Sequence, residues 1–317
     1  MGITVAIASS ARCTMSCAHC CFSCTPRTRS ELTADLVLRR VDEALAHPVV
    51  TNIALSGGEP LLRQDLVLEV ASRCKQAHKG CSLVTNGFWA VTPGKARQMV
   101  QKLWDAGVAT VTVSYDEFHA PFISQERVAN ALRCSHETPL HIVLNMGVTK
   151  KHSSLDLLAA LGNATLDVEM HRFPVLPCGA AASIDKDDFE YCFAEENLRC
   201  PEFSPLYHFD GNVYPCCSPT VCETQLAVGS VEEMSVAEAI DAMAANSLLY
   251  ILRTRGVGWL LARARQKNLD VPAVTTWTSP CEGCLALFRN PSVLRELLPD
   301  IVHEAESMSD VQPDSAK

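Results

Sequence analysis

Short apolar runs alternate with amphipathic stretches over the first 175 residues of the chain. The apolar runs, which are typical of buried strands, cover residues 3–8, 51–56, 81–85, 109–114, 140–148 and 166–173. Between them, apolar residues recur at helical spacing in residues 33–46, 64–78, 93–106, 124–134 and 153–161. This alternation predicts an α/β fold in which a parallel sheet is flanked by helices. Ligands of such folds bind at the carboxyl ends of the strands.

The pattern changes after residue 177. Asp210-Gly211 stands between alternating apolar residues and predicts a hairpin turn, and residues 236–265 predict helix interrupted near Gly256 and Gly258. From residue 304 the chain is small, polar and acidic, which predicts a disordered tail. We therefore expect a barrel domain at 1–177, a smaller domain at 178–303 and a tail at 304–317.

Composition narrows the class of protein. The chain has 317 residues, of which 48% are hydrophobic, and a net charge of −9 without a basic run, which argues against nucleic-acid binding. No apolar stretch approaches the length of a membrane span, and the first apolar segment is too short for a signal peptide. We therefore expect a cytoplasmic protein. Its 16 cysteines should then serve metal–sulfur chemistry and not disulfides.

Three of these cysteines, Cys13, Cys17 and Cys20, follow the first predicted strand at C-x3-C-x2-C spacing. Thiolates are soft ligands that suit iron–sulfur clusters. Three of them leave one iron of a [4Fe–4S] cluster open to a ligand that is not protein. A zinc site completed by Cys21 and Cys24 is the alternative.

Small and polar residues stand where the predicted strands end. They are Gly57, Gly58, Glu59, Asn86, Ser114 and Asn145. Their position favours a role in ligand binding, and the alternative is ordinary capping of strand ends.

The cysteine motif together with Gly57-Gly58-Glu59-Pro60 resembles the radical S-adenosylmethionine (SAM) superfamily. The resemblance implies a partial (β/α)6 barrel, a [4Fe–4S] cluster on Cys13, Cys17 and Cys20, and SAM chelated to the open iron. The six strand-end residues would then line the SAM pocket, and the Gly-Gly-Glu-Pro segment would hold the methionine amine. A zinc site does not explain that segment.

A second group of cysteines is spread over the C-terminal part. Cys200, Cys216 after the hairpin, and the C-x2-C pair Cys281 and Cys284 resemble the auxiliary-cluster domains of SPASM or twitch type. The resemblance implies a second [4Fe–4S] cluster on these four, with structural zinc as the alternative. Cys222 competes with Cys216 as a ligand, and the sequence assigns no role to Cys21, Cys24, Cys178 or Cys192.

The doublet Cys216-Cys217 bears on the reaction, because adjacent residues on a strand point to opposite faces. If Cys216 binds the second cluster, Cys217 faces the other way, toward the barrel mouth, where its thiol can return a hydrogen atom to a carbon radical. Abstraction of the Cα hydrogen of an L-residue and return from the opposite face give a D-residue. The alternative is an inert buried thiol.

Five stretches resemble the radical SAM peptide epimerases (the YydG or EpeE type). They are residues 17–24, 114–122, 145–150, 214–219, and 251–253 with 259–260. The resemblance implies that Cys217 is the hydrogen donor, that the substrate is a ribosomally made precursor peptide and that a flavodoxin- or ferredoxin-like reductant takes part.

Asp116, Glu117 and His119 are candidate peptide contacts, and the alternative for them is a solvated loop. Because Cys13 comes so early, we expect the peptide to be recognised in the barrel mouth or by a separate protein.

The sequence is also compatible with three other functions. A peptide cross-linking maturase, forming thioether or carbon–carbon bonds, has the same two-cluster layout but needs no returning thiol. An activase that installs glycyl radicals on a partner enzyme needs none either. A zinc-dependent binding or scaffold protein would have no redox role.

Overall fold

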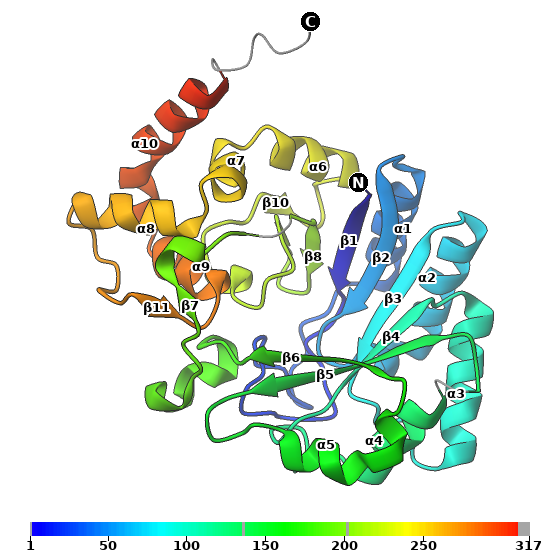
Figure 1. The fold of residues 1–317 in the computed structure, drawn as a ribbon. Helices are drawn as coiled ribbons and strands as arrows, with labels where there is room; N and C mark the ends of the chain where they lie inside the picture. Colours follow the sequence, from blue (N-terminus) through cyan, green and yellow to red (C-terminus); the bar gives the residue numbers. More distant parts are fainter. Residues whose placement is uncertain (1, 135–136, 201–202, 310–317) are drawn as a thin grey trace, which may run out of the picture.

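The computed structural model describes residues 2–134, 137–200 and 203–309. Six strands and five helices alternate in the first half, as predicted (Figure 1). The strands are β1 (Ile3–Ala8), β2 (Val50–Ser56), β3 (Gly80–Thr85), β4 (Thr110–Ser114), β5 (His141–Val148) and β6 (Glu169–Pro174). The helices are α1 (Ala34–Ala46), α2 (Gln64–Gln76), α3 (Pro93–Ala106), α4 (Gln125–Arg133) and α5 (Leu155–Leu161).

These strands form one parallel sheet in chain order from β1 to β6, so the predicted α/β class is confirmed. Each of these strands pairs in parallel with the next, and Ser114 at the end of β4, for example, stands opposite Asn145 in β5. The carboxyl ends of the strands therefore lie along one rim, where the polar strand-end residues gather.

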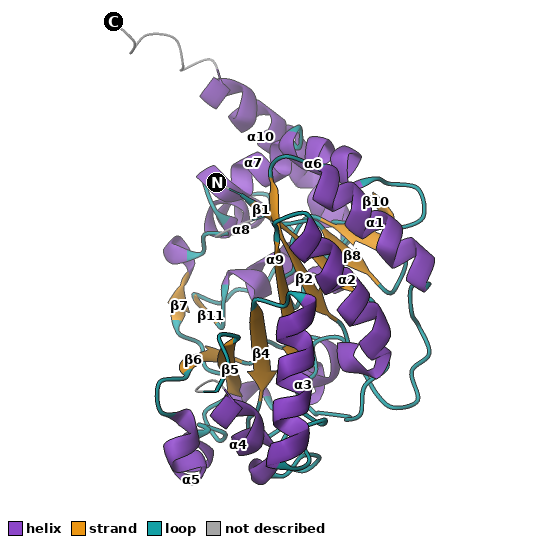
Figure 2. Cartoon of the chain, turned by 90° about the vertical axis from the view of Figure 1, so that its right-hand side faces the viewer, coloured by secondary structure: helices purple, strands orange, loops and turns teal. Residues whose placement is uncertain are grey.

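Helices α1, α2 and α3 lie over the outer face of the sheet, in front of the strands in Figure 2. Local sequence fixes where they begin and end. Thr33 caps α1 by accepting a hydrogen bond from the Leu36 N–H, and Pro93 occupies the first turn of α3. Gly107 ends α3 with φ +110°, a conformation that favours glycine.

The sheet continues past the predicted domain boundary at residue 177. The hairpin strands β8 (Leu206–His208) and β9 (Asn212–Tyr214) turn at Asp210-Gly211, as predicted, and β8 pairs in parallel with β1. With β10 (Gly229–Ser230), the sheet has nine strands among the described residues, in the order β10-β9-β8-β1-β2-β3-β4-β5-β6. Division into separate domains at residue 177 stays a prediction.

The remaining C-terminal elements pack around a second apolar core that includes Leu252, Leu260, Trp277 and Phe288. They are the short pair β7 (Phe193–Ala194) and β11 (Thr276–Trp277), and helices α7 (Ser247–Thr254), α8 (Val257–Gln266), α9 (Pro280–Phe288) and α10 (Pro291–Ser309). Helix α6 (Val236–Ala244) instead buries Val236 and Ala239 in the first core, beside the large sheet. The predicted interruption occurs at Gly256, whereas Gly258 lies inside α8.

The prediction of a disordered tail from residue 304 is wrong for residues 304–309, which belong to α10. Leu297, Ile301 and Ala305 lie one helical turn apart on the buried side of this helix, so its last turns are held by packing. Residues 310–317 of the predicted tail lie outside the described residues. In the part of the chain that the structure describes, no helix is long and apolar enough to span a bilayer.

Candidate functional site

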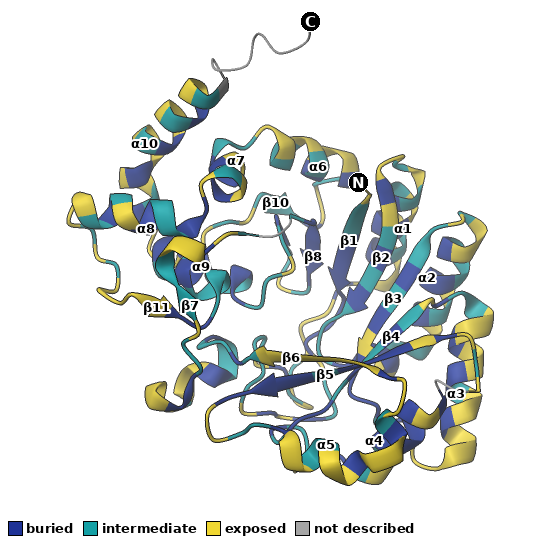
Figure 3. Cartoon of the chain, viewed as in Figure 1, coloured by how far each residue is buried: buried dark blue, intermediate teal, exposed yellow. Residues whose placement is uncertain are grey.

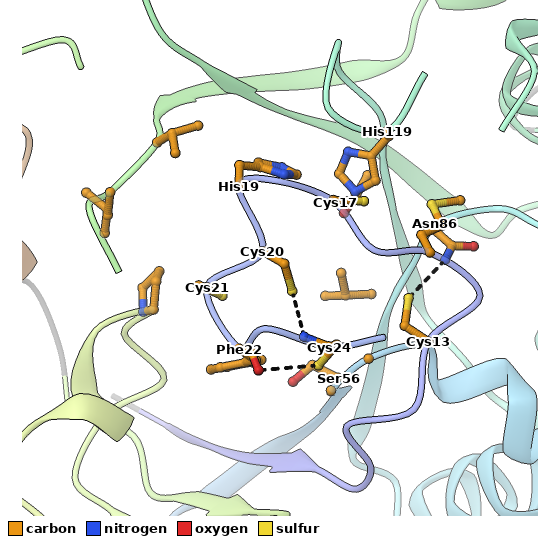
Figure 4. A pocket seen from close by; sticks show the side chains of 18 of the residues that line it. Cys13, Cys17, His19, Cys20, Cys21, Phe22, Cys24, Ser56, Asn86 and His119 are labelled. Carbon is orange, nitrogen blue, oxygen red and sulfur yellow. Dashed lines mark hydrogen bonds between the residues drawn. The ribbon is translucent and has the colours of Figure 1, made fainter. Parts of the chain in front are cut away.

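The loop after β1 brings the three motif cysteines to one cavity. Cys13, Cys17 and Cys20 line a cavity of about 270 Å³ at the carboxyl ends of the strands (Figure 4). The loop is held by a hydrogen bond from the Cys20 N–H to the Cys17 carbonyl at 3.1 Å. The Asn86 amide approaches the Cys13 sulfur at 3.6 Å. The structure thus unites the cysteines that the spacing predicts as one ligand set.

The three thiols also respond to one another electrostatically. Burial raises the pKa of Cys13 and of Cys17, and negative charge on neighbouring cysteines of the set adds to the shift. Hydrogen bonding from Cys24 lowers the pKa of Cys20 to about 6. Cys21 and Cys24 line the same cavity, so the lining alone does not single out three ligands. The C-x3-C-x2-C set of three soft sulfur ligands fits an iron–sulfur cluster with one open iron.

The Gly-Gly-Glu segment after β2 packs directly against this loop. The Gly58 N–H donates to the Ser10 carbonyl at 2.7 Å, and the Glu59 N–H donates to the Arg12 carbonyl at 2.9 Å. A Cβ at Gly58 would collide with the Arg12 carbonyl, and Gly57 has φ +131°. Glycine is therefore required here so that the end of β2 can approach the cysteine loop.

Glu59 itself is not among the residues that line the cavity. Its buried carboxylate accepts hydrogen bonds from the Leu61 N–H, the Thr85 hydroxyl and the Asn86 N–H at 2.8–3.1 Å. Burial raises its pKa to about 7, although these hydrogen bonds act in the opposite direction. Glu59 therefore positions Thr85 and Asn86 at the end of β3. The contact with SAM that the sequence predicts for Glu59 stays a prediction.

The other strand-end residues divide into two groups. Gly57, Gly58, Asn86 and Ser114 line the cavity, whereas Asn145 does not, and their predicted contact with SAM stays a prediction. Asn145 stands opposite Ser114 in the sheet, and its buried side-chain oxygen has no hydrogen-bond partner within the described residues. A buried acceptor without a donor is unusual in a folded protein, and a ligand that brings a donor would satisfy it.

Asp116 is buried just after β4, where its carboxylate contacts two histidines and a backbone N–H near the cysteine loop. Its carboxylate contacts His19 at 3.1 Å and His119 at 2.8 Å, and it accepts the Gly147 N–H at 2.9 Å. Burial opposes the charge of Asp116, but the two histidines outweigh it and hold the pKa of the carboxyl well below its usual range. Asp116 is thus a positioning residue, and both of its histidine neighbours, His19 and His119, line the cavity.

Glu117 is likewise occupied inside the protein. Its carboxylate accepts hydrogen bonds from the N–H and the hydroxyl of Ser154, at 2.8 and 2.5 Å, just before α5. Of the three candidate peptide contacts, His119 alone is among the residues that line the cavity.

The second cysteine group also converges. Cys200, Cys216, Cys281 and Cys284 all line one small cavity of about 30 Å³ between the hairpin and α9. Burial raises the pKa of Cys284, and the neighbouring charges of Cys281, Cys200 and Cys216 raise it further. Four thiols from three distant segments are the donor set that a four-cysteine metal site needs.

Cys217 and Cys222 lie elsewhere. The doublet stands just beyond β9 and not on the strand, and Cys217 is exposed and lines neither of these two cavities. Cys222 lies beside His208 and Asp210, with one ligand atom of each within 4.8 Å of the others. Among the described residues, Cys216 therefore joins the second cysteine group and Cys222 does not.

Sequence reasoning missed several residues of the first cavity. Cys178 lines it as a buried thiol, with its pKa raised to about 12 by burial, and residues 173–176 form another part of the wall. His19 stacks on Phe118 with ring centroids 4.7 Å apart. Its position inside the cysteine motif was the available signal for His19. For residues 173–176 the signal was their place at the end of the sixth predicted strand.

Fold and cysteine loop together define an enzyme class. The chain belongs to the radical SAM superfamily, whose family model matches residues 7–167, and members of this superfamily bind SAM and a [4Fe–4S] cluster. The chain is 32% identical to the peptide biosynthesis protein YydG of Bacillus subtilis (strain 168), over 93% of this chain and 95% of that protein.

Two solved structures share the fold. One is native anSMEcpe with bound AdoMet and Cp18Cys peptide, with a TM-score of 0.54 at 12% identity over 97% of this chain and 100% of that one. The other is BtrN in complex with AdoMet and 2-DOIA, with a TM-score of 0.51 at 15% identity over 82% and 90%.

Proposed function

We propose that this chain is a radical SAM enzyme that converts L-residues to D-residues in a ribosomally made peptide. The relationship to YydG, which is named for peptide biosynthesis, supports a peptide substrate. The observation that carries the reaction type is the cysteine doublet. Cys216 lines the second cavity with three other cysteines, whereas its neighbour Cys217 stays outside that cavity.

Two ligand sets follow from this proposal. Cys13, Cys17 and Cys20 hold the SAM-binding cluster, and Cys200, Cys216, Cys281 and Cys284 hold an auxiliary [4Fe–4S] cluster. When bound, the first cluster and SAM supply a 5′-deoxyadenosyl radical that removes the Cα hydrogen of the target residue. Gly57, Gly58, Asn86, Ser114 and Asn145 orient SAM, and Glu59 acts through the backbone of Asn86.

Cys217 completes the exchange by giving the hydrogen atom of its S–H bond to the opposite face of the Cα radical. The thiyl radical that remains on sulfur needs one electron and one proton before the next turnover. Because Cys217 is adjacent to Cys216, the auxiliary site would be the source of that electron. An external reductant would then reduce the auxiliary site again. His119 contacts the peptide at the rim, and Asp116 holds His119 in place.

An anaerobic assay in D2O tests this proposal. The reaction contains SAM, a reductant and the short peptide encoded next to this gene, and peptide mass and residue chirality are measured. The wild type should add one deuteron for each D-residue formed, because a thiol exchanges its hydrogen with solvent. Cys217→Ala should form no D-residue, whereas Cys192→Ala, which removes another exposed cysteine, should behave as the wild type.

Two results would contradict the proposal. A peptide that loses hydrogen mass without gaining deuterium would establish cross-linking, in which Cys217 has no donor role. D-residues formed by Cys217→Ala but not by Cys178→Ala would move the donor role to Cys178, whose buried thiol faces the first cavity.

A further inference from the structure

Strand β6 is an open edge of the large sheet. It pairs with β5 on one side, and no strand within the described residues pairs with its other side. Every residue from Glu169 to Phe173 is exposed, whereas β5 beside it is buried at most positions (Figure 3). An exposed edge strand of six residues is a template for another extended chain.

The backbone groups that face the open side can be assigned from the ladder. The Val175 N–H donates to the Val148 carbonyl at 2.9 Å, so Val175 faces β5. Because backbone groups alternate along a parallel strand, Met170, Arg172 and Pro174 face the open side. Pro174 lacks an N–H and suits that side. The edge therefore offers the N–H and C=O groups of Met170 and Arg172.

This edge leads directly into the candidate active site. Phe173 and Pro174 at the end of β6, and Val175 and Leu176 after it, line the cavity that holds the three motif cysteines. Met170 and Phe173 are 44% and 43% exposed, which leaves apolar surface along the strand for a bound chain. The Arg172 guanidinium donates a hydrogen bond to the Ser153 carbonyl at 2.6 Å. A bound chain would therefore contact mainly the backbone groups of this edge.

We propose that the substrate peptide binds as an added strand along the open edge of β6. Main-chain hydrogen bonds to Met170 and Arg172 hold it, about 4.8 Å from β6, and its target residue passes Phe173 into the cavity. The proposal rests on the peptide substrate inferred above. A peptide suits the edge better than a second copy of this chain, because the edge ends at the cavity wall, where an internal Cα has to arrive.

A proline substitution tests the edge at one backbone group. Arg172→Pro removes the outward N–H without removing a bond to β5, and Arg172→Ala removes the same side chain but keeps the N–H. The probe is a fluorescein-labelled synthetic copy of the peptide encoded next to this gene, and its binding is followed by fluorescence anisotropy. Arg172→Pro should weaken binding about tenfold, as expected for one hydrogen bond, and Arg172→Ala should change it less than about threefold.

Hydrogen–deuterium exchange on the wild type provides a measurement that does not depend on the variant folding. The amides of Met170 and Arg172 should exchange at least about tenfold more slowly with the peptide bound. Unchanged exchange at both amides would overturn the proposal. Equal binding by folded Arg172→Pro and Arg172→Ala, with folding checked by iron content and thermal unfolding, would also overturn it.

Two further outcomes are distinguishable. In the first, the amides of Met170 and Arg172 exchange more slowly when the protein is concentrated without peptide, and light scattering detects a dimer. That result would assign the edge to self-association and overturn peptide docking. In the second, Arg172→Pro weakens peptide binding as expected, but the wild type forms no D-residue. That result would support binding of the peptide along β6 and overturn epimerisation.

Discussion

At the scale of single residues, the buried carboxylate of Glu59 links the cysteine loop to the end of β3. Its pKa of about 7 means that it takes up a proton near neutral pH in the folded protein, whereas in the unfolded chain it does so near 4.5. A carboxyl group with a raised folded pKa stabilises the fold fully below the unfolded pKa. That contribution is lost as the pH rises through the folded pKa.

Glu59→Gln removes this titration and should therefore change how stability depends on pH. Between about pH 5.5 and 7.5, the free energy of unfolding of the wild type should fall by about 2 kcal/mol relative to that of Glu59→Gln. Anaerobic urea titrations of both proteins at several pH values measure the difference. Glu69→Gln, on the exposed face of α2, is the control and should follow the wild type. Parallel pH curves for wild type and Glu59→Gln would contradict the raised pKa.

The sequence predicts which residues form this site better than it predicts where their side chains point. Spacing alone predicts Cys13, Cys17 and Cys20 as one ligand set, whereas the second cysteine group was expected from the resemblance to auxiliary-cluster domains. The directions of Glu59 and Glu117 depend on partners in other segments, Thr85 and Ser154, which no local pattern indicates. The same holds for Cys217, since β9 ends at Tyr214 and strand alternation no longer governs the doublet.

At the scale of elements, the buried side chain of Arg40 links helix α1 to the segment between β10 and α6. Its guanidinium donates to the Val231 and Glu232 carbonyls, both at 2.9 Å, and pairs with Glu43 at 2.6 Å. These carbonyls follow β10, so one side chain joins the first helix to the segment that precedes α6.

Arg40→Ala should destabilise the protein by about 3 kcal/mol, because it leaves a carboxylate and two carbonyls without their buried donor. Denaturant unfolding of the anaerobically purified protein measures this loss. Arg73→Ala is the matched control, because Arg73 makes exposed ion pairs with Asp42 and Glu69 and should contribute less than about 1 kcal/mol. Equal losses in the two variants would show that the Arg40 contacts do not join these elements.

Helix α10 shows why one element was mispredicted. The acidic, polar composition after residue 304 favours disorder, and the apolar spacing of Leu297, Ile301 and Ala305 is too sparse to stand out in the sequence. Contacts with the core around α7 and α8 supply the stabilisation that composition does not reveal.

At the scale of the whole molecule, the segment that follows β9 joins the two cysteine cavities. Pro215, Cys216 and Ser218 line the second cavity, and Pro219 lines the first. The Thr220 hydroxyl donates to the Cys281 carbonyl at 2.9 Å, and the Cys178 thiol lies 3.7 Å from the Pro219 carbonyl. The two sites therefore share one stretch of backbone while each keeps its own cysteines.

Iron content tests whether the two cysteine groups are independent sites. Anaerobically reconstituted wild type should contain roughly eight iron atoms per chain, as two [4Fe–4S] clusters require. A Cys281→Ala, Cys284→Ala variant should retain roughly four and still cleave SAM. A Cys13→Ala, Cys17→Ala, Cys20→Ala variant should also retain roughly four but lose cleavage. Zinc at the second site in place of iron would contradict the auxiliary cluster.

The position of β1 between β2 and β8 has a consequence for biosynthesis. One neighbour of β1 is made some 40 residues later, but the other ends at His208, about 200 residues after β1. At roughly 5–20 residues per second, a ribosome needs on the order of 10–40 s to deliver β8. Throughout that interval the nascent chain carries β1 with one side unpaired, so the newborn protein is most exposed to aggregation before its last third has been translated.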